Sequence, residues 1–218
     1  MPFTKELLRR VKDEQQRSSI ITIYKENLEN RSYKLREAAV LEIGEIATLL
    51  GEALFNEQFF TLFLKLLKDT MNEVKKAAIQ QITSLVPTIP ASVFTETLLP
   101  NLIALVSEKN QTISEVVASV SIDLFKSYPE EIPGLFNVLF EDITPQVRLI
   151  FLKRLNELTL TSEIIQKLVF EASLDDQNWR VREEIANHMN HLLASTKESS
   201  SQEQHKSLIT IVGDMNVT

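Results

Sequence analysis

Side chains that could form ion pairs recur at a fixed spacing along this sequence of 218 residues. Five times, an acid or amide is followed six residues later by a position that is usually a base. The pairs are Asn30/Arg36, Asp69/Lys75, Glu108/Ser114, Asp142/Arg148 and Asp176/Arg182. Partly exposed ion pairs contribute only about 0.2–1 kcal/mol each. We therefore expect these positions, called the ladder below, to fix the stacking of structural units rather than to bind a ligand.

Catalytic and metal-binding patterns are weak in comparison. His188 and His191 lie three residues apart and follow Glu184, so on a helix the three would share one face. A metal site needs further ligands converging on them, and we interpret both histidines as packed or surface residues. No Gly-rich phosphate loop, Ser/His/Asp set or Cys/His pair can be assembled. The sequence predicts no catalytic residue, no metal site and no cofactor.

The ladder also reveals a repeat. The residue before each second ladder member is aliphatic, and we call these residues the anchors: Leu35, Val74, Ile113, Val147 and Val181. They recur at intervals of 39, 39, 34 and 34 residues. Self-similarity at this period is typical of repeat arrays, which present long surfaces to other proteins.

Two helices per repeat explain the pattern around each anchor. Apolar or small residues follow each anchor at helical spacing, which predicts an amphipathic helix. A more uniformly apolar helix is predicted before each one, over 20–28, 59–67, 98–106, 133–140 and 164–170. Because one helix pair cannot bury its own apolar stripe, the pairs must stack. We predict an all-α fold, an α-solenoid of about five and a half repeats.

The predicted organisation has three parts. Residues 1–16 are expected to form a capping helix, with Leu7, Leu8 and Val11 on one side. Residues 17–196 hold repeats one to five, and residues 197–218 hold a polar loop and half of a sixth repeat. An array that stops halfway indicates either a fragment of a longer array or a lone helix that serves as a cap.

Net charge and composition indicate which classes of binding partner to expect. The formal net charge is −7, whereas nucleic-acid binding needs a basic stripe. The densest basic cluster (Lys5, Arg9, Arg10, Lys12 and Arg17) is interleaved with acids, so we interpret it as a solvated face. The chain contains no cysteine, and neither a signal peptide nor a membrane span is evident. We expect protein partners in the cytosol or nucleus, no nucleic acid and no membrane.

The ladder and its anchors resemble those of HEAT repeats over about residues 17–196. Two turns resemble, more narrowly, those of the scaffold (A, 65 kDa regulatory) subunits of protein phosphatase 2A. They are Asp-Gln-Asn-Trp-Arg-Val-Arg at 176–182 and Thr-Pro-Gln-Val-Arg at 144–148. The resemblance implies a non-catalytic scaffold whose turns dock catalytic or regulatory phosphatase subunits. Carried over by motif, the contact residues are Thr144, Pro145, Gln146, Trp179 and Arg180, whereas Ile143 replaces an acid of the family turn.

Two local hypotheses follow from the same positions. Ser114 cannot replace a base, so the ladder should break in the third repeat, and residues 107–113 are a candidate flexible joint. Trp179, the single tryptophan, could be an interface hot spot or could pack across its turn onto the previous repeat.

Two other classes remain open. A tubulin-binding TOG-type domain is also a short HEAT array, with Tyr33 and Lys34 on its first turn in this chain, although an acidic chain suits acidic tubulin poorly. A helical-repeat enzyme is the third class. The helical-repeat iron hydroxylases carry His-Glu dipeptides, and this chain has none.

Overall fold

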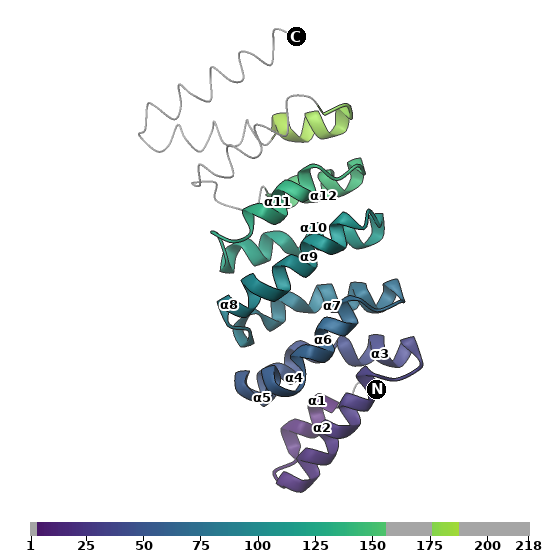
Figure 1. The fold of residues 1–218 in the computed structure, drawn as a ribbon, viewed down its shortest axis with the longest axis vertical. Helices are drawn as coiled ribbons and strands as arrows, with labels where there is room; N and C mark the ends of the chain where they lie inside the picture. The colour runs from purple at the N-terminus through teal and green to yellow at the C-terminus, as the bar shows by residue number, and fades with distance from the viewer. Residues whose placement is uncertain (1–3, 156–175, 188–218) are drawn as a thin grey trace.

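The computed structural model describes residues 4–155 and 176–187, and every regular element in these ranges is helical. The all-α prediction is thereby confirmed. Helices that are neighbours in sequence pack as pairs, and the pairs follow one another in an elongated row (Figure 1). The first helices of the pairs are α2 (Glu14–Leu28), α6 (Phe60–Leu67), α9 (Leu99–Ser107) and α11 (Pro133–Phe140). The second helices are α3 (Tyr33–Val40) with α4 (Ile43–Leu50), α7 (Asn72–Leu85), α10 (Gln111–Ser127), α12 (Pro145–Leu155) and a helix over 179–187.

The anchors begin the second helices and enter the core, with one exception. Val74, Ile113 and Val147 are fully buried and Val181 nearly so. Successive second helices pack on one another, α3 on α7, α7 on α10 and α10 on α12. Leu35 is 36% exposed, because it lies on α3, the first helix of this layer to carry an anchor. The preceding helix α1 packs on α2 and α4.

The N-terminal cap is shorter than predicted. Helix α1 spans Thr4–Arg10, and residues 14–16 already belong to α2. The carboxylate of Asp13 starts α2 by accepting a hydrogen bond from the Gln16 amide at 2.9 Å, the usual role of an N-cap aspartate. Leu8 is buried as expected, but Leu7 points to solvent.

The second helix of the first pair is broken at Leu41 and Glu42, where one continuous helix was expected. The buried Tyr24 hydroxyl donates to the Ala39 carbonyl at 2.8 Å, and the Glu42 amide also donates there. In an uninterrupted α-helix, the Ala39 carbonyl would instead accept a hydrogen bond from the Ile43 amide. A side chain that inserts into the backbone hydrogen-bond ladder is a recognised cause of kinks.

The unequal repeat lengths have a simple structural cause. The two 39-residue intervals contain additional short helices between the pairs: α5 (Glu52–Gln58) in one, and η1 (Val86–Thr88), α8 (Ala91–Val93) and η2 (Phe94–Leu98) in the other. Gly51 makes the turn into α5 with φ of 82°, a left-handed conformation that favours glycine. The 34-residue interval from Ile113 to Val147 has only residues 128–132 between α10 and α11. The predicted helix 164–170, both histidines and residues 197–218 lie outside the described residues.

Candidate functional site

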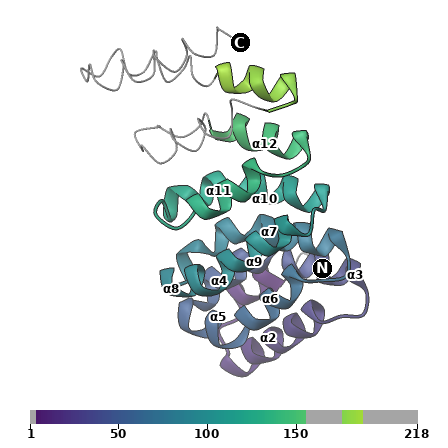
Figure 2. The same cartoon turned by 45° about the horizontal axis from the view of Figure 1, so that its top comes forward.

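The turns between paired helices follow one another along one edge of the row (Figures 1 and 2). We number them turn 1 (30–32), turn 2 (69–71), turn 3 (108–110), turn 4 (142–144) and turn 5 (176–178). In four of them the first ladder residue accepts a hydrogen bond from the backbone amide two residues later, at 2.8–2.9 Å; these residues are Asn30, Asp69, Asp142 and Asp176. Such Asx turns explain why an amide can replace an acid in turn 1.

The ladder's ion pairs connect neighbouring repeats rather than the two members of one pair. Arg36 donates from Nε and Nη2 to both carboxylate oxygens of Asp69, at 2.7 and 2.8 Å. Its Nη1 donates to the Asn30 carbonyl at 2.8 Å. Burial alone would raise the pKa of Asp69, but hydrogen bonds from Arg36 and the Met71 amide and the nearby positive charges lower it. One guanidinium therefore joins turns 1 and 2.

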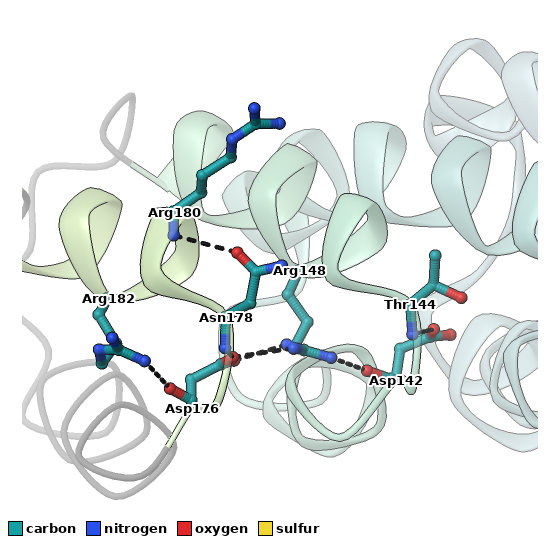
Figure 3. Close-up of polar contacts among 7 residues, drawn as sticks. All are labelled: Asp142, Thr144, Arg148, Asp176, Asn178, Arg180 and Arg182. Atoms are coloured by element: carbon teal, nitrogen blue, oxygen red, sulfur yellow. Dashed lines mark hydrogen bonds and ion pairs between the residues drawn. The ribbon is translucent and has the colours of Figure 1, made fainter.

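Arg148 repeats this geometry between turns 4 and 5 (Figure 3). Its guanidinium donates to both carboxylate oxygens of Asp176, at 2.7 and 2.9 Å, and to the Asp142 carbonyl. Arg182 then donates to the Asp176 carbonyl at 2.7 Å. The parallel two-bond geometry is the strong form of an arginine–carboxylate pair, so turns 4 and 5 are held side by side.

The junction between turns 2 and 3 is weaker. Lys75 makes one contact to Glu108, from Nζ to Oε2 at 3.3 Å. The lysine side chain is 14% exposed and the glutamate side chain 52%. Turn 3 also differs in its backbone, because Lys109 has φ of 57°.

No ion pair between described residues joins turns 3 and 4. Ser114 occupies the position of the base, is fully buried, and its hydroxyl has no hydrogen-bond partner among the described residues. The Asp142 carboxylate accepts from the Thr144 amide at 2.8 Å. The ladder therefore breaks at Ser114, in the third repeat as predicted, and the missing connection is the one between turns 3 and 4.

Trp179 starts the helix after turn 5 and is 59% exposed. The Arg180 guanidinium lies 5.4 Å from the centre of its ring, within the range of a cation–π contact. Figure 3 shows the Arg180 side chain pointing away from the ladder residues. Trp179 is therefore a largely exposed aromatic residue with a cation beside its ring.

Turn 4 adds an apolar residue that sequence reasoning did not include among the contacts. Ile143 is 65% exposed, whereas Thr144 and Pro145 are half-buried and Gln146 is exposed. The signal was present in the sequence, since an isoleucine stands where the family turn carries an acid. We call Ile143, Thr144, Pro145, Gln146, Trp179 and Arg180 the ridge.

Three bases of the N-terminal cluster form ion pairs with acids of the same chain. Glu45 accepts from Lys5 at 2.5 Å and from Arg9 at 3.1 Å, and Arg10 pairs with Glu6. The hydrogen bond from Lys5 is the main cause that lowers the pKa of Glu45. Arg17 donates to the backbone carbonyl of Leu8.

Within the described part of the chain, no three His, Cys, Asp or Glu side chains gather closely enough to hold a metal ion. None of the helices in residues 4–155 and 176–187 has the length and hydropathy needed to cross a membrane. No protein-family model matches the sequence, and a search of curated proteins finds no match.

Proposed function

We propose that this chain is a HEAT-repeat α-solenoid of about five and a half repeats that acts as a non-catalytic scaffold and docks a protein through the ridge. One observation carries the proposal: Trp179 and Ile143 are both exposed on adjacent turns that Arg148 holds together. Aromatic and arginine side chains dominate binding hot spots, and a prepositioned surface loses little entropy on binding.

In this proposal the ladder residues hold the turns together, and the ridge residues contact the partner. Arg148 and Arg182 are bound to turn carbonyls and carboxylates, whereas the Arg180 side chain points outward beside Trp179. The ridge therefore offers two apolar groups and a cation, which suits a partner segment with apolar and acidic side chains. The resemblance of turns 4 and 5 to phosphatase scaffold turns makes the catalytic and regulatory subunits of protein phosphatase 2A the first partners to test.

Direct binding to purified phosphatase subunits, with purified tubulin in parallel, tests the proposal. We expect a phosphatase subunit to bind the wild-type chain, and Trp179→Ala to weaken this binding by about tenfold or more, as for a hot-spot residue. The melting temperature should not change, because the indole is mostly exposed. Ile23→Ala is the matched control, since Ile23 is a similarly exposed apolar residue on α2, away from the ridge.

Each other outcome has a defined meaning. Binding to tubulin alone would favour the TOG-type alternative, with Tyr33 and Lys34 as the next residues to replace. Binding to neither protein would argue against a phosphatase scaffold. If Trp179→Ala mainly lowers the melting temperature, Trp179 is a packing residue and the ridge proposal is wrong.

A further inference from the structure

A second candidate site lies at the weak junction between turns 2 and 3. A cavity of about 170 Å³ opens between the end of α6, the start of α7 and the end of α9. Its lining includes apolar side chains (Leu67 and Leu105) and polar ones (Lys68, Lys75, Asn101 and Glu108). A single water needs only about 10–15 Å³ when volume is measured in this way. The cavity can therefore admit a small side-chain group.

The residue types at the ladder positions explain why a cavity remains at this junction. At the corresponding position between turns 1 and 2, and between turns 4 and 5, a planar guanidinium binds a buried aspartate through two bonds. Here a lysine faces a glutamate through one contact at 3.3 Å. An ammonium is a point charge without arginine's fork of donors. The Lys75–Glu108 contact therefore closes the junction less completely than either arginine does.

The balance of charge at the cavity favours an anion. The Lys75 side chain is mostly buried, and Glu108 is its one ion-pair partner among the described residues. Lys68 forms no ion pair with any described residue, and its side chain is exposed. Asp69 is close by, but Arg36 and the Met71 amide already occupy its oxygens. Because Glu108 is half exposed and singly bonded, an incoming carboxylate can replace it at little cost.

We propose that this cavity binds the side-chain carboxylate of a glutamate or aspartate from a partner polypeptide, which displaces Glu108 from Lys75. Lys68 supplies a second positive charge at the rim. Ala104, the exposed apolar residue of the lining, contacts the methylene groups of the incoming side chain. The cavity lies on the same edge as the ridge, but the inference does not depend on the ridge being used.

A blocked glutamate (N-acetyl, C-methylamide) is the probe, because it carries the carboxylate between peptide groups. Amide chemical shifts of the ¹⁵N-labelled full chain are followed during titration at constant ionic strength. We expect saturable shifts concentrated at residues 67–69, 75 and 101–108, with a dissociation constant of roughly 1 mM for so small a ligand. The blocked glutamine, which has the same shape without the charge, should bind at least tenfold more weakly.

Variants then separate this site from general charge attraction. Glu108→Gln should tighten binding of the blocked glutamate several-fold, since it removes the internal competitor. Lys75→Met should abolish the shifts at residues 67–69 and 101–108, and Lys68→Ala, an exposed change, should weaken binding several-fold. Glu29→Gln is the matched control, because Glu29 forms an exposed pair with Lys65 at 3.4 Å without lining this cavity.

Several results would overturn the proposal. They are shifts that do not saturate, shifts spread equally over other lysines, unchanged binding in Lys68→Ala, or weaker binding in Glu108→Gln. None of these results bears on the ridge, which is tested with Trp179 and intact protein partners.

Discussion

Arginine and lysine serve the ladder differently. Arg36 and Arg148 each bind an aspartate carboxylate through two bonds and the preceding turn through a carbonyl. Lys75 makes a single longer contact to an exposed glutamate. Removing one partner of a buried, doubly bonded pair leaves the other charge without compensation. Removing Glu108 takes away one 3.3 Å contact to a half-exposed carboxylate, and the Asp69 charge remains close to Lys75.

This difference predicts unequal costs of substitution. We expect Arg36→Met to lower the free energy of unfolding by about 3 kcal/mol, the lower end of the range for a broken buried pair. Glu108→Gln should cost at most about 1 kcal/mol, as for a single long contact to a half-exposed carboxylate. Urea unfolding at neutral pH measures both. Arg9→Met, which removes an exposed contact to Glu45, is the control; an equal loss in all three variants would contradict the distinction.

Glu42 gives a second prediction at this scale, with a defined pH dependence. Burial raises the pKa of Glu42, partly opposed by the charge of Lys5, and its Oε2 has no partner among the described residues. A raised pKa in the folded state means that Glu42 favours folding fully below its unfolded pKa. This contribution is lost as pH rises through the folded pKa.

We therefore expect Glu42→Gln to be more stable than the wild type at pH 7, and the difference to shrink towards pH 4. Urea unfolding at several pH values measures this difference. Glu45→Gln is the control with the opposite sign, because the pKa of Glu45 is lowered. That carboxylate contributes stability above its unfolded pKa and loses it as pH falls. A constant difference between Glu42→Gln and the wild type would contradict the assignment.

Among the helices, α4 and α7 approach each other unusually closely at Gly44. A Cβ placed on Gly44 would lie 2.5 Å from the Cβ of Ser84. We expect Gly44→Ala to destabilise the chain by about 1–3 kcal/mol through overpacking, despite alanine's better helix propensity. Thermal unfolding measures the loss. Adding Ser84→Gly to Gly44→Ala removes the clashing atom and should recover part of it, whereas Ser84→Gly alone should not stabilise the protein.

Sequence periodicity located the helices well, because each one carries its own pattern. The predicted helix 133–140 matches α11 residue for residue. The break at Leu41 and Glu42 could not be predicted in this way, since it depends on the Tyr24 hydroxyl from another helix. Spacing alone also could not give the exact partners: Arg36 and Arg148 each bind the carbonyl of their own turn and the carboxylate of the next turn.

At the candidate site, too, local motifs could be read from the sequence, whereas contacts between helices could not. Its turns were found from Asp176, Trp179 and the residues around Pro145, all of which belong to local motifs. Whether the Trp179 indole packs across its turn or faces solvent depends on neighbouring repeats, so sequence left both readings open. The structure exposes it, and Ile143 with it.

The row as a whole is joined unevenly along its turn edge. Turns 1 and 2 and turns 4 and 5 are joined by arginine, turns 2 and 3 by lysine, and turns 3 and 4 by no ion pair between described residues. At the junction between turns 3 and 4 the helices still pack, with Phe125 of α10 and Phe136 of α11 at 5.4 Å between ring centres. Arg154 also binds Asp123 there, at 3.0 Å. Separation of these repeats should therefore begin at the turn edge.

In a stack of repeats, local opening depends on each repeat and its nearest neighbours. We expect hydrogen exchange of the wild-type chain to be faster for amides of 108–113 and 142–147 than for the corresponding amides of 30–35 and 69–74. Arg36→Met should remove the protection of the first junction and leave exchange at 142–147 unchanged. Uniform protection across turns 2 to 4 would contradict a joint. If Arg36→Met speeds exchange at every turn equally, the array unfolds as one unit and the uneven ladder has no consequence for its motion.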